Sequence, residues 1–228
     1  MIDSSLSRTP VLGQPALVPV PSRLPVVLGA VLAAAVVVWL GGLLADTSVP
    51  SAVDATVAAG LAQGTWSDVV TTLGEPGTVV AVAGLVAIAS LWRGRNVRLA
   101  ALAVLGPGLT GVVTTVAKPL VGRRLPDGSL SFPSGHTAGV TGICLLLGFA
   151  LVAAYGARRG MLLAIGAATV VAAGLVGAGM VAEHAHYATD VLGGFCAAVA
   201  ATAVAALAID ALAARVLAAA TSARPTGG

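Results

Sequence analysis

The sequence predicts an all-α polytopic membrane protein, folded as a bundle of six transmembrane helices. Its 228 residues are 57% hydrophobic and only 9% charged, and their mean hydropathy is +0.99, far above that of a water-soluble domain. A helix needs about 20 apolar residues to cross a bilayer. Apolar runs of this length predict spans over residues 24–45, 77–93, 97–118, 135–156, 161–182 and 190–212.

The predicted organisation is one membrane domain with a tail at each end. Residues 1–23 contain four prolines and predict a disordered or extended cytoplasmic tail. Residues 24–215 hold the six spans, and residues 216–228 form a second cytoplasmic tail. Between the first two spans, residues 54–73 place apolar side chains at multiples of four. This spacing predicts an amphipathic helix on the outer interface of the membrane.

The arginines predict the orientation. Loops rich in arginine are cytoplasmic by the positive-inside rule, and arginines mark both tails and two connections, namely Arg8, Arg23, Arg93, Arg95, Arg98, Arg158, Arg159, Arg215 and Arg224. Both termini are therefore predicted to be cytoplasmic. The other connections are acidic, with Lys118, Arg123 and Arg124 as their basic residues, and they are predicted to face outward.

Two polar elements flank the start of the fourth span. Lys118 ends the third span and is followed by a short cationic loop with Arg123 and Arg124, which suits a phosphate dianion. Ser134 then precedes the fourth span and can cap it, while Gly135 lets an anion approach the exposed N–H groups of the helix start. His136 lies in the first turn of this helix.

A third polar element opens the sixth span. His186 and Asp190 are four residues apart and share one helical face. An aspartate that accepts one imidazole N–H fixes the tautomer and leaves the other nitrogen free to attack phosphorus. Glu183 and His184, just upstream, are interpreted as rim residues of the same site. All three elements fall at helix ends on one predicted face of the membrane, which indicates phosphate chemistry at that surface.

Other classes of function fit the residues less well. A transporter would carry its charges along a path through the bilayer, whereas here they gather at one face. A metal held by His136, His184, His186 and Asp190 is disfavoured because His184 and His186 are two apart, on roughly opposite sides of a helix. The sequence contains neither a basic stripe nor an aromatic platform, the features that would indicate nucleic-acid binding. No metal, cofactor or nucleic-acid partner is therefore predicted.

This pattern resembles the type 2 phosphatidic acid phosphatase (PAP2) family of integral membrane lipid phosphatases. The matching residues lie in spans three to six and are Lys118, Pro126, Pro133, Ser134, Gly135, His136, His186 and Asp190. The resemblance implies that His186 forms a phosphohistidine, that Asp190 orients it and that His136 protonates the leaving group. It further implies that Lys118, Ser134 and the Gly135 amide bind phosphoryl oxygens, without a metal.

The chain departs from the family pattern at two charged positions. Leu125 stands where the family usually has arginine before the proline of its first motif, and Gly179 with Met180 replaces a serine-arginine pair. Arg123 is the preferred substitute as a phosphate clamp, and Arg124 a weaker one. A catalytically degraded scaffold is the alternative that these losses leave open.

The resulting prediction is a metal-independent phosphatase acting on a lipid phosphate or diphosphate at the outer leaflet. Polyprenyl diphosphate, phosphatidic acid and phosphatidylglycerol phosphate are all compatible substrates. Eleven of the 12 basic residues are arginine in a chain rich in alanine, valine and glycine, which suggests a bacterial inner membrane. The expected partners are the substrate and membrane lipids, and the oligomeric state is left open.

Overall fold

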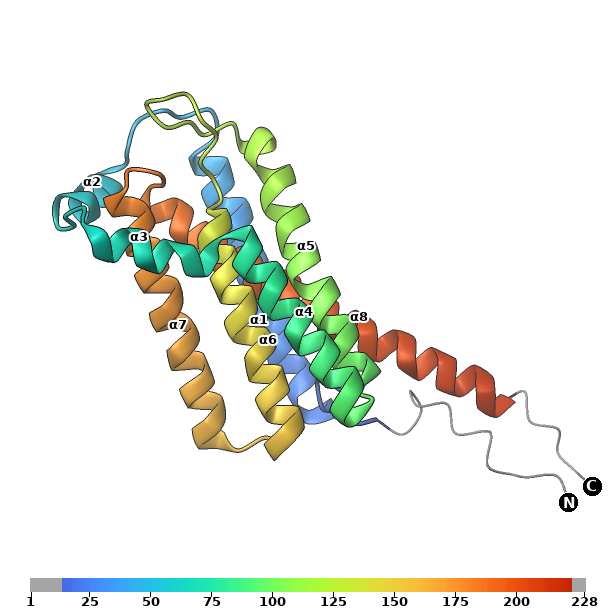
Figure 1. Cartoon of the computed structure of the whole chain (residues 1–228). Coiled ribbons are helices and arrows are strands. Elements are labelled where there is room, and N and C mark those ends of the chain that lie inside the picture. Colours follow the sequence, from blue (N-terminus) through green and yellow to red (C-terminus); the bar gives the residue numbers. More distant parts are fainter. Residues whose placement is uncertain (1–13, 223–228) are drawn as a thin grey trace, which may run out of the picture.

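The computed structural model describes residues 14–222 and confirms the predicted six-span helical bundle (Figure 1). Each of the six long helices is long and apolar enough to cross a membrane. They are α1 (Val20–Leu43), α4 (Pro76–Gly94), α5 (Val97–Val121), α6 (Gly135–Tyr155), α7 (Arg159–Ala182) and α8 (Ala188–Ser222). Large apolar side chains cover their outer surfaces, and Trp92 is 85% exposed, as expected of helices that face lipid.

Helix α8 is the centre of the bundle and packs against α1, α5, α6 and α7. Its buried face consists largely of alanine and glycine, and such small side chains let helix backbones approach closely. A Cβ atom at Gly193 would overlap the Phe132 ring, and one at Gly194 would overlap the carbonyl of Ser134. The start of α8 therefore fits tightly against the loop that leads into α6.

Two short helices lie at one end of the bundle and correct the single outer helix predicted over 54–73. They are α2 (Ala52–Ala59) and α3 (Thr65–Thr71), followed by a 3₁₀ turn, η1 (Thr72–Gly74). Gly60 closes α2 and Gly64 precedes α3. Glycine is a poor helix former, and the two helices pack on different partners, α2 on α8 and α3 on α7. The regular spacing of apolar residues continues across the two glycines, so it did not reveal the break between the helices.

The described part of the N-terminal tail is ordered, so the prediction of disorder is wrong for residues 14–23. Leu17 and Val18 are buried, and their N–H groups donate to the Asp210 carboxylate of α8 at 3.0 and 2.8 Å. Arg98 also pairs with Asp210, at 3.1 Å. At the other terminus α8 continues to Ser222, so residues 216–222 are helical. Residues 1–13 and 223–228 lie outside the described residues.

Candidate active site

A cavity of about 880 Å³ lies between α4, α5 and α6 at the end of the bundle that carries α2 and α3. Three of its described lining residues are ionisable, namely Lys118, His136 and His186. Its remaining wall is mostly apolar and follows α5 from Lys118 to Ala103, a length of about four helical turns. The cavity therefore joins a polar end to a long apolar groove.

The two histidine motifs are joined through their backbones. The Ser134 N–H donates to the Asp190 carbonyl at 3.0 Å, and this contact relies on the absence of a side chain at Gly194. The Ser134 hydroxyl accepts from the Thr137 N–H at 3.4 Å and caps α6, as the sequence predicts. It is fully buried, whereas Gly135 and His136 line the cavity.

His186 faces the Asp190 carboxylate. Its Nδ1 lies 3.6 Å from Asp190 Oδ2, slightly beyond hydrogen-bond length, while the Tyr187 N–H donates to the same oxygen at 2.9 Å. Contacts of this kind often tighten only when substrate is bound. Since Nδ1 points to the aspartate and the ring borders the cavity, Nε2 is the nitrogen available to a substrate.

Lys118 and His136 complete the polar end of the cavity. The Lys118 ammonium donates to the Leu130 carbonyl at 3.0 Å, which leaves two of its three N–H donors for another ligand. His136 is close enough to Lys118, His186 and Glu75 to interact with their charges. Glu75, an exposed residue at the N-cap of α4, is the acidic residue among them, and the sequence analysis did not single it out.

The 3₁₀ turn η1 presses against the first turn of α6. A Cβ atom at Gly74 would overlap the backbone of His136, and one at Gly139 would meet the Gly74 carbonyl. The position of His136 therefore depends on a glycine at residue 74.

Replacing Gly74 by alanine should move His136 or strain the contact. Overpacking of this kind costs about 1–3 kcal/mol, and a shift of about 1 Å in a reacting group can cost about 100-fold in rate. We expect Gly74→Ala to lower kcat by 10- to 100-fold and to lower the thermal midpoint in detergent. Gly77→Ala is the matched control, because no atom lies within 4 Å of its Cβ position. Equal activity in the two variants would contradict the proposed contact.

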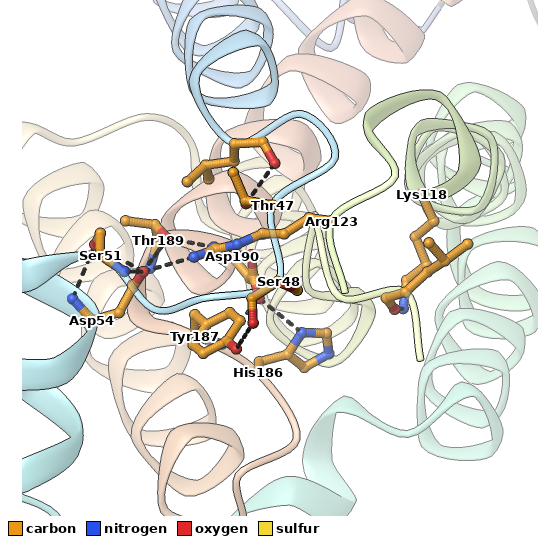
Figure 2. Close-up of polar contacts among 12 residues, drawn as sticks. Thr47, Ser48, Ser51, Asp54, Lys118, Arg123, His186, Tyr187, Thr189 and Asp190 are labelled. Atoms are coloured by element: carbon orange, nitrogen blue, oxygen red, sulfur yellow. Dashed lines mark hydrogen bonds and ion pairs between the residues drawn. The ribbon is translucent and has the colours of Figure 1, made fainter. Parts of the chain in front are cut away.

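Arg123 does not line the cavity, in contrast to the expected phosphate clamp. Its side chain is 0% exposed. Its Nη2 lies 2.7 Å from Asp54 Oδ2, and its Nη1 lies 2.6 Å from both Asp190 Oδ1 and Thr189 Oγ1 (Figure 2). The Tyr187 ring stacks below the guanidinium at 4.2 Å. A buried guanidinium needs such carboxylate partners to offset its desolvation.

The other predicted site residues lie around this centre. Arg124 is exposed and donates to the Gly128 carbonyl at 2.9 Å. Glu183 accepts from Ser67 and from Gln63 and so fastens α3 to the end of α7. His184 is exposed, with a left-handed φ of 55°. None of these three predicted residues is among the described residues that line the cavity.

Leu125 and Met180, which stand where the resembled family usually has arginine, have different surroundings in this structure. Leu125 is buried in the loop before α6. Met180 is also buried, and it borders the same cavity as Lys118 and His186. A neutral thioether thus occupies the wall where a cation would be expected.

Asp54 is the main site residue that the sequence analysis missed. It is 1% exposed, although it belongs to a short helix at the membrane surface. Its only sequence signal is the Ser51-x-x-Asp54 spacing, a capping box that the structure shows in full. In the structure, the Thr189 N–H and hydroxyl also donate to Asp54, both at 2.9 Å.

Within residues 14–222, no three histidine, cysteine, aspartate or glutamate side chains gather as a metal site would require. The site consists instead of two histidines, one lysine and a buried carboxylate pair. Together with the six spans, it defines a polytopic helical membrane protein with a histidine-centred site at one end.

Residues 122–213 match the family model of the PAP2 superfamily. This segment is similar to the PAP2 superfamily, whose members are generally phosphatases. The matched segment contains the Pro133–His136 element and the His186–Asp190 pair. Comparisons with curated proteins and with solved structures gave no significant match.

Proposed function

We propose that the protein hydrolyses the phosphate or diphosphate group of a membrane lipid, without a metal, through a phosphohistidine. The observation that carries this proposal is the shape of the cavity. Its polar end holds Lys118, His136 and His186, and its apolar groove continues between α4 and α5. A phosphate group attached to a long hydrocarbon chain matches both parts, whereas a water-soluble phosphate would leave the groove empty.

In the first step, the Nε2 lone pair of His186 attacks phosphorus. A P–N bond forms as the bond to the lipid oxygen breaks, and His136 gives its proton to the departing oxygen. Asp190 stabilises the positive charge that develops on the imidazole ring. Lys118 and the N–H groups at the start of α6 bind the phosphoryl oxygens.

In the second step, water attacks the phosphohistidine. His136, now neutral, takes a proton from the water as the new P–O bond forms and the P–N bond breaks. Inorganic phosphate leaves, and both histidines return to their starting protonation states. The same pair of residues thus acts as nucleophile and as acid and base in turn.

The site is proposed to face the outside of the cell. The connections α4–α5 and α6–α7, which carry Arg93, Arg95, Arg158 and Arg159, lie at the end of the bundle opposite to the cavity. The positive-inside rule places those connections in the cytoplasm. The substrate is then a lipid of the outer leaflet, and both chain termini are cytoplasmic.

Phosphate release from purified protein in detergent tests this function directly. The substrates are phosphatidic acid, phosphatidylglycerol phosphate and polyprenyl diphosphate, each assayed with EDTA present. We expect release from at least one of them at an unchanged rate in EDTA. Loss of activity in EDTA would instead indicate a metalloenzyme, and no release from any substrate by folded protein would support a non-catalytic scaffold.

The groove should discriminate substrates by chain length. Gly111 borders the groove, and no atom lies within 4 Å of its Cβ position, so Gly111→Leu should fill groove space without disturbing the helix. We expect KM for a long-chain lipid phosphate to rise about tenfold, the effect of losing one or two buried methylene contacts. A short-chain soluble analogue should be hydrolysed as before.

Gly166→Leu is the matched control for this prediction. Gly166 also has open space at its Cβ position, but it lies on α7 and is not among the described residues that line the cavity. If both variants raised KM for the long-chain substrate equally, the groove would not be the chain-binding site.

A further inference from the structure

The catalytic aspartate belongs to a buried chain of charges that ends on α2. Asp190 Oδ1 accepts from Arg123 Nη1 at 2.6 Å, and Arg123 Nη2 donates to Asp54 Oδ2 at 2.7 Å. All three side chains are 0% exposed. Figure 2 shows the guanidinium lying between the two carboxylates, with His186 on the far side of Asp190.

The count of charges in this cluster favours a positive imidazole. Asp54 and Asp190 together carry two negative charges, and Arg123 carries one positive charge. One net negative charge therefore remains beside His186, where positive charge develops during attack on phosphorus. Without Asp54, Arg123 would be paired with Asp190 alone, and the cluster would be neutral.

Asp54 is built to stay ionised. Burial by itself would raise its pKa, but hydrogen bonds from the Thr189 N–H, from Arg123 and from Ser51 outweigh burial and lower the pKa to about 2. Because the folded pKa lies below the ordinary value of 3.8, the stabilisation is present above that value and is lost only as the pH falls toward 2. The carboxylate is thus a constant charge over the working range of an enzyme.

We propose that Asp54 is a positioning residue of the active site, which neutralises Arg123 so that Asp190 keeps its charge for the imidazole of His186. The same contact fastens α2 and the irregular segment before it to the site. The Arg124 N–H donates to the Thr47 carbonyl at 2.9 Å, and the Asp46 N–H donates to the Val121 carbonyl at 2.9 Å. The outer segment is therefore part of the catalytic apparatus, in addition to connecting two spans.

The test rests on the proposed phosphatase activity and uses the pH dependence of kcat/KM. The groups facing His186 are Lys118 from α5, His136 from α6 and Asp190 from α8, and Asp54→Asn leaves all of them in place. We expect the acidic limb of the profile to move to lower pH by about one unit, because a neutral cluster stabilises the protonated ring less. kcat should fall about tenfold, with KM nearly unchanged.

A second substitution separates this role from simple packing. If Asp54 acts by neutralising Arg123, the double variant Asp54→Asn/Arg123→Gln restores one net negative charge and should return the acidic limb to its wild-type position. A packing role predicts the opposite, since the double variant loses more contacts. If Asp54→Asn alone does not fold, the double variant provides the test. An acidic limb of the pH profile at the wild-type position supports the proposal, and an acidic limb shifted to lower pH overturns it.

Asp68→Asn is the control, because Asp68 is an exposed carboxylate of α3. It should leave the profile unchanged. An unchanged acidic limb in Asp54→Asn, with only a lower thermal midpoint, would overturn the proposal. Absence of turnover in the wild-type protein would instead refute the proposed function, so the two failures are distinguishable.

Discussion

His186→Ala should reduce turnover of the lipid phosphate by about 10⁶-fold, as expected when a covalent nucleophile is removed. His186 lines the cavity, and its Nδ1 lies 3.6 Å from the Asp190 carboxylate, which leaves Nε2 for attack on phosphorus. The measurement is steady-state phosphate release, together with quenching of the wild-type enzyme in alkaline detergent in the presence of labelled substrate. The quench should trap an acid-labile phosphoenzyme that the variant does not form.

The neighbouring histidine provides the control. His184 is exposed and belongs to the same short connection between α7 and α8. His184→Gln should raise KM more than it lowers kcat, as expected for a rim residue. A labelled phosphoenzyme in His186→Ala, or its loss in His184→Gln, would show that the roles are assigned to the wrong residues.

Asp190→Asn should lower kcat by about 10⁴-fold, the loss found when the acid that orients a catalytic histidine is replaced by its amide. The variant should also be less stable, because Arg123 would keep only Asp54 as a charged partner, and breaking a buried ion pair costs about 3–5 kcal/mol. Both quantities are measurable on one preparation, as kcat and as the thermal midpoint in detergent.

Asp127→Asn is the matched substitution for this prediction. Asp127 lies in the exposed loop before α6 and accepts from Ser129, and it makes no contact with Arg123. It should change neither quantity appreciably. A near-normal kcat in Asp190→Asn would show that the Asp190 carboxylate takes no part in the mechanism, even if the variant protein were destabilised.

The six spans could be predicted because membrane insertion imposes one dominant requirement. A helix that crosses a bilayer must be about 20 residues long and apolar throughout, and the hydropathy of this chain shows that pattern without reference to any partner. The largest difference is at the last span, which was predicted to end at residue 212 and reaches Ser222. Half of the residues from 213 to 222 are alanine, a strong helix former, so the helix continues beyond the predicted span.

The polar centre could be predicted only in part. His136, His186 and Asp190 occur at helix starts in recognisable motifs, so their gathering at one end followed from the topology. The pairing of Arg123 with Asp54 could not be predicted in this way, because it depends on which carboxylate reaches the buried guanidinium in three dimensions. Asp54 already had a complete local explanation as the N3 residue of a capping box. A residue whose hydrogen bonds are satisfied locally gives no sign that it also bonds to Arg123 and Thr189.

The long separation in sequence between the partners of Asp54 has a consequence for biogenesis. Asp54 is 69 residues from Arg123 and 135 residues from Thr189. As the chain is synthesised from its N-terminus, the first span and α2 emerge well before either partner. Asp54 therefore stays exposed to water at the membrane surface during synthesis, and it becomes fully buried only when the last helix has inserted. A chain released before α8 would lack the Thr189 contacts and would leave the Asp54 carboxylate exposed to water, a feature by which quality-control proteases could recognise incomplete assembly.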